Sequence, residues 1–423
     1  MARKNRGKTK RKATPSSTLV VPSPPTVDPQ AETAATASID VLPEFVVQDI
    51  LRRLYLADLL RAALASHCWR RLASRCLPRA PPLLGYFFHP TEVPPPVPAP
   101  DTKIVDTPAV FAPLDASSPR LSLDFAPDAF RYLVFDSHQG LLLHEPSKRP
   151  PKGILPRFLV LDPATRRRTV LSPPPRDTVP DDRRWRSSRH YVGSALLSRS
   201  HPSKLCFEAV CFAIDGGHPR VWVASVDDGN CRWRALPRDE DVVVDFDPWW
   251  FEGRAVHAGG KIYWHICNSW RMLVLDPSTL KFSYLLVPDA LSPHKYRIGE
   301  TPDGRLCMVT DAQEQLQLWV RSNARSSDNG WILEKRIVDL RVVCDEAEIP
   351  GMPTYRTHCV WPSDMDAGRT GKVFIKTWGF GRYSFHMDTS KMERLSTKRG
   401  KEYGHPMFAY FLAWPPAFLV PEY

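Results

Sequence analysis

Residues 158–171 read FLVLDPATRRRTVL, and residues 273–286 read LVLDPSTLKFSYLL. Each stretch consists of an apolar strand-like run, an Asp-Pro-x-Thr sequence and a second strand-like run. Asp and Pro favour tight turns, and an alternating pattern places every second side chain on the same face of a strand. Both stretches therefore predict β-hairpins, and their similarity predicts a repeated unit.

Looser copies of this hairpin occur elsewhere in the chain, at residues 221–236, 318–337 and 383–395. Further strand-like runs precede the hairpins, at residues 132–145, 205–214, 255–266, 299–311 and 371–378. The turns recur about every 50 to 60 residues, and four short strands in a repeat of that length are typical of a β-propeller blade. Residues 104–423 have room for six blades. We predict a mainly antiparallel, six-bladed β-propeller, with a two-sheet β-sandwich as the alternative.

Upstream of this domain, residues 42–76 have a helical period instead. The apolar residues of the first predicted helix share one face, at spacings i, i+3, i+4 and i+7: Val47, Ile50, Leu51 and Leu54. Asp58 and Ser66 are expected to be the N-caps of a second and a third helix. Three helices of this size bury their own apolar surface poorly, so we expect the unit to need a partner surface.

The same unit resembles the F-box, the adaptor-binding module of cullin-based ubiquitin ligases. The resemblance is carried by Leu42-Pro43, Ile50-Leu51, Leu54, Leu59-Leu60, Ser66 and Trp69-Arg70. Tyr55 and Ala65 depart from the family pattern, which usually has Pro and Val there. The resemblance implies docking to a Skp-type adaptor, and through it to a cullin, by Leu42, Pro43, Val47, Ile50, Leu51, Leu54, Leu59, Leu60 and Trp69. The alternative is an ordinary helical subdomain packed on its own chain.

Two further stretches resemble plant F-box proteins that carry a C-terminal F-box-associated domain. They are DSHQGLLL at 136–143 and the Leu-Leu-Gly-aromatic run within 78–100. The whole chain is therefore predicted to be an α+β multidomain protein. Its predicted parts are a disordered basic and Pro/Ser/Thr-rich tail (1–40), an F-box (41–77), a proline-rich linker (78–103) and a propeller-like substrate-binding domain (104–423).

The net charge of +11 is concentrated at the N-terminus, where residues 1–12 hold seven Lys or Arg and no acidic residue. Such a tail is a nuclear localisation signal, a salt-sensitive nucleic-acid contact or merely a solvated segment. The nine cysteines form no C-x-x-C pair, as in proteins that keep their thiols reduced. Because no apolar run is long enough to span a bilayer, we expect no membrane association and a nuclear or cytoplasmic location.

The sequence contains no G-x-S-x-G, no phosphate-binding G-x-x-x-x-G-K-[ST] and no H-E-x-x-H motif of catalysis or metal binding. His257 and His265 lie in a strand-like run without ligand spacing, and we expect them to be core or turn histidines. The sequence therefore predicts no catalytic residue, no metal and no cofactor. A propeller enzyme with an unrecognised site in its channel is kept as an alternative.

One basic, aromatic-bearing segment is expected to be an exposed loop that binds the target: Arg183, Arg184, Trp185, Arg186 and Arg189. Trp and Arg dominate binding hot spots, and a guanidinium pairs bidentately with carboxylate or phosphate. Trp249 and Trp250 are open between a loop role and packing inside a blade. Stacking combined with basic charge also describes single-stranded nucleic-acid binding. A nuclear nucleic-acid-binding protein is therefore the second reading, with nucleic acid the less favoured partner.

The favoured reading is a non-catalytic substrate receptor of a Skp–cullin–F-box ubiquitin ligase. Its F-box would dock the adaptor, and its β domain would hold a target protein of unknown identity. The receptor would act by proximity, because it raises the concentration of the target near a remote active centre.

Overall fold

The structure is a computed structural model of the 423-residue chain. It describes residues 42–78, 80–91, 107–114, 119–148, 154–174, 189–202, 204–227, 229–267, 269–288, 296–312, 315–322, 330–337, 360–365, 370–377, 381–395, 403–404, 406–416 and 419. The predicted tail at 1–40 and the proline run at 92–100 lie outside these residues. No helix in the described part has the length and apolar character needed to cross a membrane.

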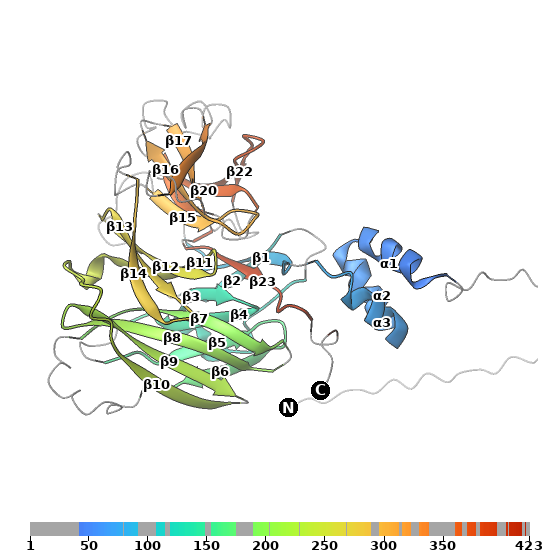
Figure 1. Ribbon diagram of the computed structural model, residues 1–423, viewed down its shortest axis with the longest axis horizontal. Coiled ribbons are helices and arrows are strands. Elements are labelled where there is room, and N and C mark those ends of the chain that lie inside the picture. The colour runs from blue at the N-terminus through green and yellow to red at the C-terminus, as the bar shows by residue number, and fades with distance from the viewer. Residues whose placement is uncertain are drawn as a thin grey trace, which may run out of the picture.

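Three short helices form an N-terminal helical unit: α1 (Glu44–Arg53), α2 (Leu56–Ala65) and α3 (His67–Ser74) (Figure 1). Ser66 caps α3 as predicted, because its hydroxyl oxygen accepts a hydrogen bond of 3.2 Å from the Trp69 amide. Asp58 is not the predicted cap of α2, which already begins at Leu56. Asp58 lies instead in the first turn, where the helix dipole favours an anion.

The rest of the described chain forms six antiparallel sheets, five of them with four strands and one with three. The first blade contains β3 (Tyr132–His138), β4 (Leu141–Pro146), β5 (Phe158–Asp162) and β6 (Arg167–Leu171). The second contains β7 (His190–His201), β8 (Cys206–Asp215), β9 (His218–Asp227) and β10 (Asn230–Arg238). The third contains β11 (Phe251–Ala258), β12 (Lys261–Ile266), β13 (Arg271–Asp276) and β14 (Lys281–Leu286).

The fourth blade contains β15 (Tyr296–Glu300), β16 (Leu306–Ala312), β17 (Gln315–Arg321) and β18 (Trp331–Ile337). The fifth contains β19 (Val360–Met365), β20 (Lys372–Thr377), β21 (Gly381–His386) and β22 (Met392–Arg394). The three strands of the sixth are β1 (Leu83–Phe88), β2 (Val110–Pro113) and β23 (Phe408–Phe411). Two short 3-10 helices, Pro127–Arg131 and Pro248–Trp250, precede β3 and β11. The six-bladed propeller is thereby confirmed, and the sandwich alternative is excluded.

The sixth blade closes the ring with strands from both ends of the domain. β1 lies between β2 and β23, so that Phe87 pairs with Phe111 on one side and with Phe408 on the other. β23 also contacts β3, the inner strand of the first blade. The predicted linker at 78–103 therefore needs correction, because Leu83–Phe88 is a strand of the propeller. Its buried aromatic side chains give the reason.

The core of the propeller lies between neighbouring blades rather than at the centre of the ring. Each of the six junctions holds its own cluster of buried apolar side chains. Between the second and third blades, for example, the rings of Phe212 and Trp264 pack with centroids 4.6 Å apart. Burying such side chains contributes about 1.5–3 kcal/mol each, so every junction adds to the stability of the ring.

The two Asp-Pro-x-Thr stretches form the hairpins β5–β6 and β13–β14, as predicted. In the first turn, the Asp162 carboxylate accepts hydrogen bonds of 3.1 Å from the amides of Ala164 and Thr165. In the second, Asp276 accepts a hydrogen bond of 2.9 Å from the Ser278 amide. A carboxylate that bonds the backbone two residues ahead is the known stabilising feature of such turns. The repeat therefore corresponds to the third and fourth strands of a blade.

Candidate functional site

Three of the residues predicted to contact the adaptor lie in the core of the helical unit. Val47, Leu51 and Leu59 are 6%, 0% and 3% exposed. A side chain already buried in its own unit cannot be buried again against a partner, so the structure corrects the prediction for these three. Of the remaining predicted residues, Leu60 and Trp69 pack partly buried on this core, and Leu42, Pro43, Ile50 and Leu54 are exposed.

The helical unit also exposes large apolar side chains that the helical period did not single out. Phe45, Tyr55 and Leu64 are 72%, 85% and 59% exposed. With the exposed members of the predicted set, they make up what we call the exposed apolar group: Leu42, Phe45, Ile50, Leu54, Tyr55 and Leu64. Single exposed apolar residues are ordinary, but this many in one small helical unit are typical of an interaction module.

The end of the described chain ties the helical unit to the propeller. Leu419, which follows β23, is 7% exposed and packs in the core of the helical unit. The Trp414 indole nitrogen donates a hydrogen bond of 2.9 Å to the Pro78 carbonyl, just after α3. The helices therefore lie beside the ring, to the right of β1 and β23 in Figure 1.

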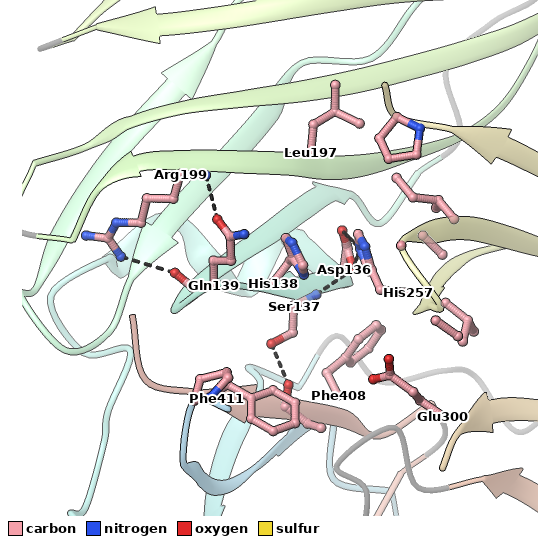
Figure 2. Close-up of a pocket in the computed structure, with 18 of the residues that line it drawn as sticks. Asp136, Ser137, His138, Gln139, Leu197, Arg199, His257, Glu300, Phe408 and Phe411 are labelled. Carbon is pink, nitrogen blue, oxygen red and sulfur yellow. Dashed lines mark hydrogen bonds and ion pairs between the residues drawn. The ribbon is translucent and has the colours of Figure 1, made fainter. Parts of the chain in front are cut away.

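A cavity of about 540 Å³ opens where inner strands of the propeller meet (Figure 2). Its lining comes from β3, β7, β11, β15 and β23, with the start of β12 and the chain after β23. The polar and aromatic side chains in this lining are Asp136, Ser137, His138, Gln139, Arg199, Arg254, His257, Lys261, Glu300, Phe408, Phe411 and Trp414. We call it the channel-mouth cavity. Its volume suits a small ligand or a few residues of a peptide.

Asp136 joins three blades beneath this cavity. Its side chain is buried and accepts hydrogen bonds from the Leu196 amide of β7, at 2.7 Å, and from the His257 Nε2 of β11, at 2.9 Å. Burial alone would raise the pKa of Asp136, but the charge and hydrogen bond of His257 lower it below the ordinary value. The carboxylate is therefore ionised at neutral pH and fixes the relative positions of the first three blades.

Two histidines with opposite pKa shifts stack in the wall of the cavity. The rings of His138 and His257 lie 4.1 Å apart and are nearly parallel, at 8°. Burial would lower the pKa of His257, but the charge of Asp136 and its hydrogen bond raise it above the ordinary value. Burial and the nearby His257 lower the pKa of His138 to about 3. Near neutral pH, His138 is therefore neutral, whereas the protonated form of His257, on which it stacks, is favoured.

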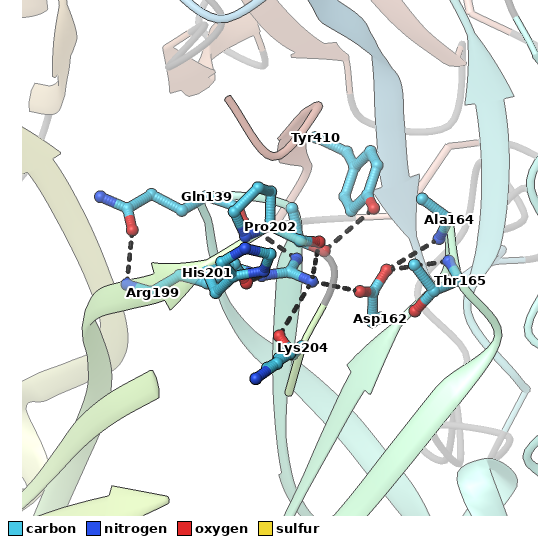
Figure 3. A network of polar contacts seen from close by, with 10 residues as sticks. Gln139, Asp162, Ala164, Thr165, Arg199, His201, Pro202, Lys204 and Tyr410 are labelled. Atoms are coloured by element: carbon cyan, nitrogen blue, oxygen red, sulfur yellow. Dashed lines mark hydrogen bonds and ion pairs between the residues drawn. The ribbon is translucent and has the colours of Figure 1, made fainter. Parts of the chain in front are cut away.

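The buried guanidinium of Arg199 connects chain segments at the rim of the cavity by hydrogen bonds (Figure 3). Its guanidinium donates hydrogen bonds of 2.6 Å to the Asp162 carboxylate and to the Pro202 carbonyl, and one of 3.0 Å to the His201 carbonyl. Its backbone amide donates to the Gln139 side chain at 2.6 Å. Asp162, the turn residue of the first blade, therefore also holds an arginine of the second.

Ser137, His257 and Asp136 are the residue types of a hydrolytic triad, but their geometry differs from one. The Ser137 hydroxyl donates its hydrogen bond to the Ala409 carbonyl, at 2.7 Å. A nucleophile must instead donate to its general base, and the base to a carboxylate. The hydrogen bond of Ser137 therefore links β3 to β23.

The predicted target-binding loop receives no support from the described residues. Arg183, Arg184, Trp185 and Arg186 lie outside them. Arg189 is 7% exposed, with its guanidinium 4.8 Å from the Trp222 ring and its Nε 3.7 Å from the Asp215 carboxylate. The structure therefore corrects the prediction for Arg189, which belongs to the interior of the second blade. Trp250 is exposed at 42%.

The channel-mouth cavity was not predicted from the sequence. Asp136 and His138 belong to the DSHQG stretch, which by its sequence indicates only a family resemblance. Their partner His257 lies in another blade, 121 residues after Asp136. A pattern of local spacings cannot reveal a pair of this kind. The signal that could have marked the region is the cluster of polar residues at the end of a predicted inner strand.

A protein-family model described as "F-box protein AT5G49610-like, beta-propeller" matches residues 135–418. No curated protein matches the chain. Among solved structures, the Cps50 (Swd1) β-propeller domain of Myceliophteria thermophila is 13% identical with a TM-score of 0.36, covering 73% of this chain and 85% of its own. A DUF4784 family protein from Bacteroides caccae is 10% identical with a TM-score of 0.41, covering 78% and 74%.

Proposed function

Because this chain belongs to the AT5G49610-like family of F-box protein β-propellers, we propose that it is the substrate-recognition subunit of a Skp–cullin–F-box ubiquitin ligase. In this proposal the helical unit docks the Skp-type adaptor, and the propeller holds a target protein. The chain itself supplies no catalytic residue. It brings the target to the ligase and acts in the nucleus, the cytoplasm or both.

The observation that carries the proposal is the exposed apolar group of the helical unit. The unit has a small core, in which Leu51 and Leu72 pack together with Leu419 from the end of the described chain. It nevertheless leaves six large apolar side chains in water. A folded module with such a surface is suited to bind another protein rather than to pack further on its own chain.

The energetics of docking agree with this role. Full burial of a Leu, Ile or Phe side chain contributes about 1.5–3 kcal/mol. The apolar members of the group already have part of their surface covered, so we count about half of that value for each. If the adaptor covers all six, they contribute roughly 5–9 kcal/mol, which is comparable with the cost of association.

The channel-mouth cavity is the place we assign to the target. Its polar groups come from rigid inner strands, and its floor is fixed by the Asp136–His257 pair. A few well-placed polar groups in a concave, partly apolar site are typical of specific recognition. We expect a short segment of the target to enter it, with Lys261 at the exposed edge.

The adaptor half of the proposal is tested by co-purifying the full chain with a Skp-type adaptor. The informative variant is Ile50→Asp with Leu54→Asp, at side chains that are 38% and 37% exposed. The matched control is Val170→Asp with Leu286→Asp, at apolar side chains of the propeller that are 49% and 46% exposed. We expect the first pair to weaken adaptor binding by at least about 100-fold and the control pair to leave it unchanged. Adaptor binding at the wild-type level by the first pair would refute the docking role.

The target half is tested separately with Lys261→Glu at the edge of the cavity. Proximity labelling in cells compares the proteins captured by this variant and by the wild type. We expect the variant to lose the proteins that the wild type enriches while it retains the adaptor. An unchanged set of captured proteins would show that the target binds elsewhere on the propeller.

A further inference from the structure

Glu252, His265 and Cys267 meet between the third and fourth blades, outside the channel-mouth cavity. Glu252 belongs to β11, His265 to β12, and Cys267 follows β12 directly. One carboxylate oxygen, one imidazole nitrogen and the thiol sulfur all lie within 4.8 Å of one another. Cys267 lies two residues after His265, in the turn that follows β12, and its sulfur lies close to the His265 ring. The antiparallel partner strand brings Glu252 to them.

The distances in this cluster match those around a single ion. Glu252 Oε1 lies 3.1 Å from His265 Nδ1 and 3.9 Å from Cys267 Sγ. A zinc ion takes oxygen and nitrogen ligands at about 2.0–2.2 Å and sulfur at about 2.3 Å. Tetrahedral ligands at these bond lengths lie about 3.3–3.8 Å apart. Small side-chain rotations would therefore bring all three atoms onto one centre.

The ring nitrogens of His265 give the strongest evidence that the cluster binds a ligand. The His265 side chain is 7% exposed, and neither of its ring nitrogens has a hydrogen-bond partner in the described structure. The short Nδ1 to Oε1 approach does not have the direction of a hydrogen bond. Burying a polar group without a hydrogen-bond partner is unfavourable, because the group gives up its hydrogen bonds to water. Coordination of a metal by one of the ring nitrogens would remove this cost.

Tyr296, from the fourth blade, packs beside the cluster. The Tyr296 ring at the start of β15 packs edge-on against His265, with centroids 4.4 Å apart. Its hydroxyl is also buried without a hydrogen-bond partner among the described residues. An ion or an ion-bound water at the cluster would give this hydroxyl a partner as well.

We propose that Glu252, His265 and Cys267 bind a divalent transition-metal ion of the zinc type. A thiolate and an imidazole favour such an ion over Mg²⁺ or Ca²⁺, which prefer oxygen ligands. The carboxylate and the thiolate balance its two positive charges, and a water molecule or the Tyr296 hydroxyl takes the fourth position. The ion would link β11 to the end of β12, the first two strands of the third blade, where they meet the fourth blade.

The cationic side chain of Arg297 approaches the cluster, and its position is compatible with the proposal. Its Nη1 lies 3.7 Å from Glu252 Oε1. The guanidinium is held by the Ser363 and Tyr296 carbonyls, to which it donates hydrogen bonds of 3.0 and 2.8 Å. The same oxygen, Oε1, faces His265, Cys267 and Arg297, so a metal bound by Glu252 would share this carboxylate with a guanidinium that its own hydrogen bonds hold in place.

The test measures metal binding by the full-length protein. The protein is purified without chelators, its metal content is determined by mass spectrometry, and Zn²⁺ affinity is measured by competition with a chromophoric chelator. Co²⁺ then serves as a spectroscopic probe, because a cobalt-bound thiolate gives a charge-transfer absorption. The variants are His265→Ala and Cys267→Ser. Cys231→Ser is the control, since Cys231 is also a half-buried free thiol but lies in β10 outside the cluster.

We expect one high-affinity Zn²⁺ per chain in the wild type and in Cys231→Ser. Loss of a direct ligand should weaken binding by at least about 100-fold, since even changes to residues behind the ligands cost 10–100-fold. The cobalt charge-transfer band should be absent from Cys267→Ser only, and Zn²⁺ should raise the melting temperature of the wild type but not of His265→Ala. Equal zinc affinity in Cys267→Ser and Cys231→Ser would overturn the proposal. So would a wild type that binds no Zn²⁺ above the level of His265→Ala.

Discussion

Replacement of Arg199 by methionine removes the charge that joins the first two blades at the rim of the cavity. Arg199 and Asp162 are 3% and 1% exposed in their side chains, and their charged atoms lie 2.6 Å apart. Methionine keeps most of the apolar volume but leaves the Asp162 carboxylate buried with only its two turn amides. The variant therefore tests whether this ion pair stabilises the folded propeller.

The expected cost follows from the burial of the pair. Removing one partner of a buried ion pair costs about 3–5 kcal/mol, because the other charge stays buried without compensation. The two amide hydrogen bonds to Asp162 place this case near the lower end, at about 3 kcal/mol. In the double variant with Asp162→Asn, neither charge remains. We expect the double variant to lose about 2 kcal/mol less than the sum of the two single variants.

The assay is denaturant unfolding of the full chain, followed by tryptophan fluorescence. Arg168→Met is the matched control, because Arg168 on β6 forms an exposed ion pair with Asp128 in the 3-10 helix before β3, and the loss of this pair should cost less than about 1 kcal/mol. A cost of less than 1 kcal/mol for Arg199→Met would refute this reasoning. Additivity of the two single variants to within about 0.5 kcal/mol would refute it as well.

Three further predictions follow from other parts of the fold. Burial lowers the pKa of His144 to about 3, so the unfolded chain takes up a proton below pH 6.5 while the folded chain does not. The free energy of unfolding should therefore fall by about 2 kcal/mol between pH 7 and pH 5. In His144→Leu it should depend less on pH than in the wild type, and an equal pH dependence would contradict this expectation. Leu51→Ala should destabilise the helical unit by about 2–5 kcal/mol in thermal unfolding, whereas Phe45→Ala should not shift its melting. At Gly85 (φ 155°), a Cβ would lie 2.1 Å from the Ala112 carbonyl, so Gly85→Ala should disrupt the β1–β2 pairing and increase proteolysis of the sixth blade. Wild-type resistance to protease would contradict that last expectation.

The propeller could be predicted because its determinants are local. The Asp-Pro-x-Thr turns carry their own hydrogen-bonding chemistry, and the alternation of apolar residues gives the strands directly. What escaped prediction at this level was β1. Its run of Leu, Tyr and Phe resembles no turn-linked hairpin, because both of its partners are distant: β2 lies beyond the proline-rich stretch and β23 near the end of the chain.

The helical unit shows the limit of periodicity in a small module. The i, i+3, i+4, i+7 pattern correctly found an apolar side of α1, but that side contains Val47 and Leu51, which build the internal core. Phe45 and Tyr55, outside the pattern, are among the most exposed apolar side chains of the unit. Spacing identifies which residues share a face. It does not say whether that face is covered by the chain itself or by another protein.

Neither the cavity nor the Glu252–His265–Cys267 cluster could be found by spacing alone. Each depends on the register between strands, which brings residues from separate segments within hydrogen-bond or coordination distance. His265-x-Cys267 by itself is too short to indicate a metal site. The sequence prediction of no metal was drawn from local motifs, and the proposed site rests on contacts that only the folded structure supplies.

The composition of the sixth blade also affects how the protein is made. The helical unit, β1 and β2 leave the ribosome first, but β1 cannot complete its pairing until Phe408–Phe411 has been synthesised. Until then, the inner edge of β1 and the junction with the first blade stay open, and open strand edges invite aggregation and proteolysis. A chain that terminates early would have the proposed adaptor-docking helices but no closed ring. The helical unit and the closed ring can therefore be present together only after translation has passed Phe408–Phe411.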